Sequence, residues 1–179
     1  MDKLEQLIQS CCEGKASAQR AIFERYSPYM LNVCLHYFQQ LNEAEEVMLK
    51  GFYTIFSKID TYTAQGHFEA WMRRIMVNTA IDHFRKKRTN GKIHFFDDLP
   101  DFASPSVPAD KSLEHKDILA LVHQLPTGYR MVFILFVIEG YSHAEIAEKF
   151  GISESTSKTQ LMKARKFLQR IINNLQLQA

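Results

Sequence analysis

SHAEIAEKFGISESTSKTQLMKARKFLQR, residues 142–170, has the pattern of two helices joined by a tight turn. Ser142 and Glu145 have the S-x-x-E spacing of a capping box, which predicts the start of a short helix. Gly151 can adopt a positive φ angle, so we expect that helix to end there, and Ser153 can cap the next one. This order predicts a helix-turn-helix, whose second helix lies in the major groove of DNA.

The predicted second helix separates inward from outward positions. Its inward positions are Ser157, Leu161, Ala164 and Leu168. No acidic residue follows Glu154 in the printed sequence, which removes repulsion from DNA phosphates. We expect the outward side chains to face DNA, with the last two reaching phosphates: Ser155, Lys158, Thr159, Met162, Lys163, Arg165 and Lys166. The alternative is a basic helix face that is merely solvated.

A second group of polar residues lies in the predicted helix from His67 to Lys87. Its members recur at spacings that place them on one face: Trp71, Arg74, Asn78, Asp82 and Arg85. Tyr62 and His67, in the preceding loop, could close a small pocket beside them. Aromatic rings stack on unpaired bases while Arg and Asn hold phosphates and base edges, so this face predicts single-strand binding. Alternatively, Trp71 belongs to the core.

Charge and composition divide the chain. The 179 residues are 46% hydrophobic and 23% charged, as in an ordinary globular protein, and the net charge of +2 does not by itself indicate nucleic-acid binding. Between two basic clusters lies an acidic segment with three of the five prolines, which predicts a linker. We therefore predict an N-terminal domain at 1–89, a linker at 90–112 and a C-terminal domain at 113–179.

Both domains are predicted to be helical, giving an all-α fold of two small domains. Asn42 and Glu45 predict a cap opening a helix from Glu43 to Lys58, and Ser27-Pro28 predicts a kink or restart. The run MVFILFVI, 131–138, has strand-like composition but lacks strand partners nearby, so we predict a helix.

The sequence shows no signal peptide and no membrane-spanning run, and we expect a cytoplasmic protein with reduced cysteines.

Two stretches resemble one family. SKIDTYTAQGHFEAWMRRIMVNTAIDHFRK, 57–86, resembles regions 2.3 and 2.4 of the extracytoplasmic-function sigma factors. LPTGYRMVFILFVIEGYSHAEIAEKFGISESTSKTQLMKARKFL, 125–168, is similar to their region 4. The resemblance implies a protein that binds the clamp and flap of core RNA polymerase and directs it to promoter DNA. It also implies that an anti-sigma factor could be a partner.

The resemblance assigns roles residue by residue. Trp71, Arg74 and Asn78 match positions at the melted minus-ten element, with Asp82 on the same face and Tyr62 in the loop that receives a flipped base. Lys158, Thr159, Met162 and Lys163 match positions facing the minus-thirty-five element. The segment 42–56 resembles region 2.2, which docks on the polymerase, and its candidate contacts are Glu43, Glu45, Glu46, Leu49 and Lys50.

This sequence departs from the family pattern at two places. Leu49-Lys50 replaces the usual pair of Gln and an acid in region 2.2, which changes the polarity of the docking surface. Ser157 stands where Val is more usual in the recognition helix, and its hydroxyl can bond back to a helix carbonyl. The resemblance further implies that the acidic linker threads through the polymerase between the two domains.

Two other classes of function remain as alternatives. A helix-turn-helix regulator that does not join the polymerase would need a ligand pocket or phosphoacceptor domain, and neither is indicated. An enzyme would need a catalytic motif, but no phosphate-binding loop, His-x-x-x-His pair or nucleophile elbow occurs. We therefore expect no enzymatic activity, no cofactor and no metal.

Overall fold

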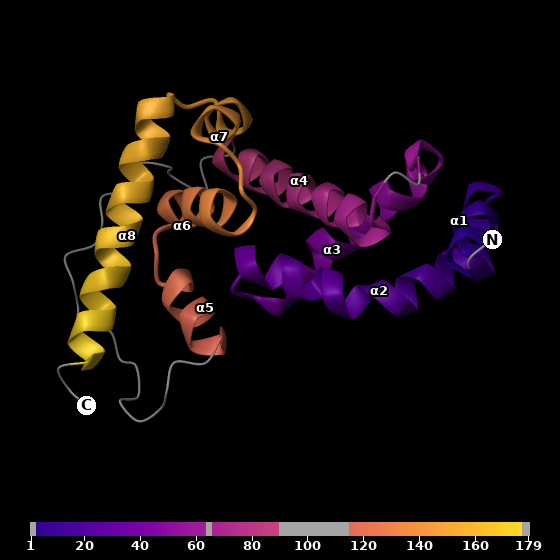
Figure 1. Cartoon of the computed structure of the whole chain (residues 1–179), viewed down its shortest axis with the longest axis horizontal. Helices are drawn as coiled ribbons and strands as arrows, with labels where there is room; N and C mark the ends of the chain where they lie inside the picture. The colour runs from indigo at the N-terminus through magenta and orange to yellow at the C-terminus, as the bar shows by residue number, and fades with distance from the viewer. Residues whose placement is uncertain (1–2, 64–65, 90–114, 177–179) are drawn as a thin grey trace. The chain divides into compact units, whose positions relative to one another are not determined.

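The structure is a computed structural model that describes residues 3–63, 66–89 and 115–176. Within these ranges the secondary structure is helical and contains no β-strand, which confirms the all-α prediction (Figure 1). The chain divides into two compact units, Met1–His83 and Phe84–Ala179. The predicted domain limits at residues 89 and 113 stay predictions, because the linker between them lies outside the described residues.

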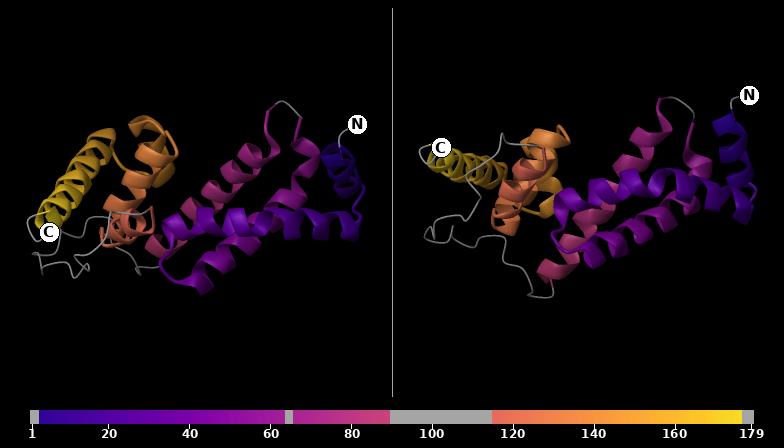
Figure 2. Two further views of the ribbon diagram at one scale, coloured as in Figure 1. Left: turned by 60° about the horizontal axis from the view of Figure 1, so that its bottom comes forward. Right: turned by 90° about the horizontal axis from the view of Figure 1, so that it is seen from below.

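The first unit is built on three long helices. Its elements are α1 (Lys3–Cys12), α2 (Ala16–Tyr37), α3 (Leu41–Ser57), a short 3-10 turn η1 (Ile59–Thr61) and α4 (Phe68–Thr89), which continues into the second unit. Figure 2 shows α2, α3 and α4 lying alongside one another. Phe23 of α2 meets Phe52 of α3 edge to face at 4.8 Å, and Phe38 meets His83 of α4 at 5.3 Å.

A glycine sets the distance between α3 and α4. A Cβ atom at Gly51 would lie 2.3 Å from the Sδ of Met76, well inside van der Waals contact. Met76 is fully buried, so its side chain fills the space that a larger residue at 51 would need. Gly51 thus lets the two helices that carry the predicted binding residues pack directly on each other.

Two boundary predictions in this unit are wrong. Helix α3 begins at Leu41 after Gln40, whose side chain makes no capping bond, so Asn42 lies in the first turn rather than at the cap. Helix α2 runs through Ser27 and Pro28 without interruption, so the predicted restart does not occur, whereas the alternative of a kink there stays a prediction. Pro28 is exposed, whereas Tyr26 and Met30 on either side are buried, so core packing holds the helix together across the missing hydrogen bond.

The second unit contains the predicted helix-turn-helix. Its elements are α5 (His115–His123), α6 (Thr127–Phe133), a π-helical turn η2 (Ile134–Ile138), α7 (His143–Phe150) and α8 (Glu154–Gln176). The run 131–138 is helical as predicted, but its second half has the wider π register, in which the amide of Glu139 bonds to the carbonyl of Ile134. This turn leaves Val137 and Ile138 partly exposed, at 47% and 43%.

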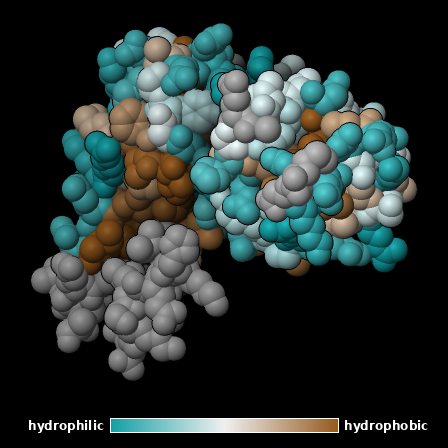
Figure 3. Space-filling view, turned by 45° about the vertical axis from the view of Figure 1, so that its right-hand side comes forward, coloured by the Kyte–Doolittle hydropathy of each residue, from teal (hydrophilic) through white to brown (hydrophobic). Residues whose placement is uncertain are grey.

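The surfaces of the units differ. Figure 3 shows hydrophobic residues gathered on the second unit, whereas hydrophilic residues cover most of the drawn face of the first. None of the helices in the described ranges is long and apolar enough to cross a bilayer. Large apolar side chains exposed among the described residues include Leu41, Leu49, Tyr53, Val137, Ile138 and Met162.

The three cysteines lie in different environments. Cys11 and Cys34 are buried and Cys12 is exposed, and all three thiols are free. Burial raises the pKa of the Cys34 thiol to about 12 and also raises the pKa of Cys11.

Candidate nucleic-acid interface

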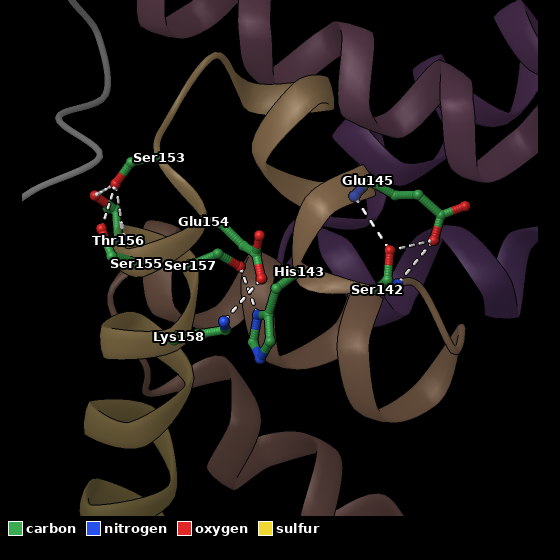
Figure 4. A network of polar contacts seen from close by, with 9 residues as sticks. All are labelled: Ser142, His143, Glu145, Ser153, Glu154, Ser155, Thr156, Ser157 and Lys158. Carbon is green, nitrogen blue, oxygen red and sulfur yellow. Dashed lines mark hydrogen bonds and ion pairs between the residues drawn. The ribbon is translucent and has the colours of Figure 1, made fainter.

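Helix α7 has its predicted cap at both ends. At its start, the amide of Glu145 donates to Oγ of Ser142 at 3.2 Å, and the amide of Ser142 donates to Oε2 of Glu145 at 2.8 Å (Figure 4). At its end, Gly151 has a φ of 60°. The amides of Gly151 and Ile152 bond to the carbonyls of Glu148 and Ala147, the two bonds of a Schellman motif. The turn before α8 is therefore fixed by backbone hydrogen bonds.

Helix α8 begins with the predicted serine cap. Oγ of Ser153 accepts a hydrogen bond from the amide of Thr156 at 3.0 Å and also lies 2.8 Å from Oγ of Ser155. The first contact satisfies the amide of Thr156 at the helix start, where no helical partner exists. Ser155, one of the predicted DNA contacts, is exposed at this end of the helix.

The faces of α8 follow the prediction closely. Ser157, Leu161 and Ala164 are buried, and Leu168 is half-buried. Buried positions that the sequence reasoning missed are Gln160, Phe167 and Ile171. The predicted DNA contacts are exposed except for one, Lys163, which is half-buried; the exposed ones are Ser155, Lys158, Thr159, Met162, Arg165 and Lys166.

Basic side chains on α8 make contacts within the second unit. Nζ of Lys158 lies 2.8 Å from Oε1 of Glu154, and the hydrogen bond from Lys158 lowers the pKa of the Glu154 carboxyl. Lys163 lies over the ring of Tyr129 at 5.9 Å, and Arg165 lies at the same distance from the ring of Phe136. The Glu-to-Lys spacing of four was the signal for the first contact, and the sequence reasoning did not use it.

A polar contact joins the two helices of the motif. Nδ1 of His143, at the start of α7, lies 2.9 Å from Oγ of Ser157, whose exposed fraction is 0% (Figure 4). The imidazole also stacks on Phe136 of η2 at 4.4 Å. Partial burial lowers the pKa of His143, and the charges of Lys158 and Arg165 lower it further, whereas Glu154 raises it. The sequence reasoning placed Ser157 inward but did not identify its partner.

The second candidate site brings its predicted aromatic residues together. The rings of Tyr62 and Trp71 lie 5.5 Å apart, and Phe68 stacks on Trp71 at 5.6 Å with 20° between the planes. The hydroxyl of Tyr62 donates to the carbonyl of Gly66 at 2.7 Å. Both Tyr62 and Trp71 are half-buried, so each has one part in the packed cluster and one part accessible.

The polar members of this site continue along α4. Arg74, Asp82 and Arg85 are exposed, Asn78 is half-buried, and His67 is exposed just before the helix. Along α4 these residues follow the aromatic cluster at Trp71 and lead to Arg85 near the C-terminal end of the helix. The geometry is that of one surface with a stacking end and a charged end, suited to a polyanion with accessible bases.

The predicted protein-binding residues lie on α3. Glu45, Glu46, Leu49 and Lys50 are exposed, and Lys50 pairs with Glu46. Glu43 differs: it is half-buried, and its carboxylate lies 2.9 Å from Nε2 of His83 on α4. The sequence reasoning missed Tyr53, which is 76% exposed and lies one turn beyond Leu49.

Two family models match the chain, one in each half. A family model described as Sigma-70 region 2 matches residues 22–89, and one described as Sigma-70, region 4 matches residues 115–168. Together they span more than half of the chain, in the same order as the two candidate sites.

Curated relatives match nearly end to end. The chain is 27% identical to the ECF RNA polymerase sigma factor SigW of Bacillus subtilis, over 96% of this chain and 98% of the relative. It is 24% identical to the RNA polymerase sigma-H factor of Pseudomonas aeruginosa, over 96% and 94%. A solved structure of the sigma factor RpoE with the anti-sigma factor NepR from Bartonella quintana has a similar fold, with a TM-score of 0.51, 19% identity and coverage of 86% and 96%.

Proposed function

This chain belongs to the extracytoplasmic-function sigma factors of the sigma-70 family, and on that premise we propose how its two units divide the work of promoter recognition. As a sigma factor it binds core RNA polymerase and directs promoter-specific initiation of transcription. The alternative of a regulator outside the polymerase is not favoured, because the chain carries region 2 in addition to the helix-turn-helix.

In this proposal α8 reads the minus-thirty-five element. The observation that carries it is the exposed basic face of a helix whose start is fixed by the cap at Ser153 and the turn at Gly151. Side chains near the N-terminus of such a helix meet base edges in the major groove. Lys158 and Thr159 would contact bases, whereas Arg165 and Lys166 would contact phosphates.

The face of α4 would hold the melted minus-ten element. The accessible parts of Tyr62 and Trp71 offer stacking surfaces, and each base–aromatic stack contributes roughly 1–3 kcal/mol. Arg74 and Asn78 follow on the same helix and would bind phosphate and base edges. His67, Asp82 and Arg85 would flank them.

The exposed face of α3 would dock on the polymerase clamp, and region 4 would meet the flap. Leu49 and Tyr53 supply apolar area beside Glu45, Glu46 and Lys50, so the contact would combine apolar and charged groups. Glu43 would support this surface through His83 instead of touching the polymerase.

The remaining proposals concern setting and control. Sigma factors are DNA-binding regulatory subunits, and we propose that this one has no catalytic activity of its own and works in the cytoplasm, where polymerase transcribes. The solved neighbour is held by an anti-sigma factor, which supports the proposal that a protein of that class also controls this chain.

The test is reconstitution. The full chain would be mixed with core RNA polymerase of its host, purified as a complex and used for run-off transcription on genomic fragments. We expect a stable complex and discrete transcripts that core polymerase alone does not make. Binding to DNA fragments without association with core polymerase would contradict the proposal.

A further inference from the structure

The hydroxyl of Ser157 is buried at the crossing of α7 and α8. It shares a hydrogen bond with Nδ1 of His143, 2.9 Å away, and Figure 4 shows the imidazole reaching from the first turn of α7 toward α8. A hydrogen bond fixes distance and direction, whereas an apolar contact at the same place is non-directional. This crossing therefore constrains the rotation of α8 more tightly than apolar packing would.

His143 is itself held from a third element. Its ring lies 4.4 Å from Phe136 of η2, with 22° between the planes, and the guanidinium of Arg165 lies 5.9 Å from the same Phe136 ring. The contacts thus join η2 to α7, α7 to α8, and α8 back to η2. Moving the imidazole would disturb the contacts to both Ser157 and Phe136.

The position of Ser157 links this constraint to DNA reading. Ser157 directly precedes Lys158, and successive residues of an α-helix are turned by a fixed angle about its axis. Holding Ser157 inward therefore sets the direction in which Lys158 and Thr159 leave the helix. An error in that direction would displace the side chains that meet base edges.

We propose that His143 is a positioning residue for promoter recognition, which fixes the rotation of α8 through Ser157 without touching a base itself. The proposal rests on the proposed role of α8 in reading the upstream element. It predicts that loss of the hydrogen bond lowers selectivity between DNA sequences, even where the packing of the unit is preserved.

The experiment uses the full chain with host core polymerase and a pool of promoter duplexes with a randomised upstream element. Wild-type holoenzyme first selects its preferred duplex. The ratio of affinities for the selected and a scrambled duplex is then measured for each variant, together with the thermal midpoint. His143→Asn retains a polar atom near the Nδ1 position, Ser157→Val removes the hydroxyl, and the double variant His143→Phe with Ser157→Val replaces the pair by apolar groups.

We expect the affinity ratio of Ser157→Val and of the double variant to fall about tenfold, the loss that follows when a base-reading side chain is misplaced. The double variant should keep a thermal midpoint near that of wild type, and His143→Asn should keep the affinity ratio. Thr79→Val is the matched control, since it removes a half-buried hydroxyl bonded to Ile75 in α4, and it should leave the upstream ratio unchanged.

The outcomes distinguish failure of the proposed function from failure of the positioning role of His143. A wild-type holoenzyme that selects no upstream sequence would overturn the proposed function itself. Sharp selection by wild type and equally sharp selection by the double variant would overturn only the positioning role, because packing alone would then suffice. A loss of upstream selectivity in Thr79→Val comparable to that in Ser157→Val would also overturn it.

Discussion

Single residues on α8 divide into two kinds by what lies next to them. Lys158 is exposed near the helix start and pairs with Glu154 across one turn, an exposed contact that is easily exchanged for a DNA group. Arg165 lies two turns further along and rests against Phe136. The first position is suited to reading a base and the second to holding the backbone.

Lys158→Ala should weaken binding to the preferred upstream element by about 1–3 kcal/mol and relax sequence preference there. Arg165→Ala should weaken binding to all sequences alike and reduce the salt dependence of binding, because a phosphate contact is lost. Both are measured by titrating holoenzyme against preferred and scrambled duplexes at several salt concentrations. Equal losses on both duplexes for Lys158→Ala would exclude base reading by that side chain.

We expect His143 to make the stability of the second unit sensitive to acid. Its pKa is lowered in the folded chain by partial burial and by Lys158 and Arg165, with Glu154 acting in the opposite direction. A lowered pKa means that the folded state prefers the neutral ring. This contribution to stability is complete above the ordinary histidine pKa of about 6.5 and is lost as the pH falls through the lower folded value.

We therefore expect wild type to lose more protection than His143→Asn between pH 7.5 and pH 5.5, measured by hydrogen exchange of amides in α8 after correction for intrinsic rates. Both proteins carry the same acidic residues, so the difference reports the imidazole together with its coupling to Glu154, whose pKa His143 helps to lower. Identical losses of protection would show that His143 does not carry the effect.

At the scale of elements, the sequence predicted what local chemistry determines. The capping box at Ser142, the turn at Gly151 and the inward face of α8 follow from short-range hydrogen bonds and helical spacing, and they are confirmed. The predicted cap at Asn42 and the predicted restart at Pro28 are wrong, because α3 begins at Leu41 and α2 continues through Pro28 between the buried residues Tyr26 and Met30.

The contacts around the candidate sites were harder to predict than the helices. The partners of Ser157 and Glu43 lie 14 and 40 residues away, at His143 and His83, and helical spacing says nothing about such pairs. The π register of η2 could not be predicted either. Composition indicates that a segment is helical, but it does not indicate which carbonyl each amide bonds to. What the sequence did predict is which residues share a face.

At Gly151, the turn between α7 and α8 should depend on the backbone conformation and not on space for a side chain. No atom lies within 4 Å of a Cβ placed there, so Gly151→Ala would meet no steric obstacle and would cost only the left-handed φ, about 1–2 kcal/mol. Gly151→Asn should cost less, because Asn tolerates that conformation better. Chemical denaturation of the two variants checks the order, and equal stability of Gly151→Ala and wild type would contradict it.

At the scale of the whole molecule, the two units carry different steps of initiation in our proposal. The helix-turn-helix would bind duplex DNA, whereas the face with Trp71 and Asn78 would act only after the strands separate. A substitution that impairs duplex binding and one that impairs strand opening should therefore respond differently to a template that is already melted.

Asn78→Ala should leave closed-complex formation intact but reduce strand opening, because the upstream contact survives while a contact to unpaired bases is lost. Permanganate footprinting of thymines with core polymerase present measures the opening. A template already melted at the minus-ten site should restore part of the transcription of Asn78→Ala, and it should restore less for Lys158→Ala. Normal opening by folded Asn78→Ala would remove that residue from the site.

Because the three cysteines differ in burial, this chain should accept a label at a single cysteine. A thiol reacts as its thiolate, so the buried Cys34, with a pKa of about 12, and the buried Cys11 should remain unmodified at neutral pH. Cys12 is exposed at the end of α1 and should take up a maleimide dye in the native protein. A fluorophore could therefore be placed on the first unit without changing a residue, and its emission could follow assembly with the polymerase in real time.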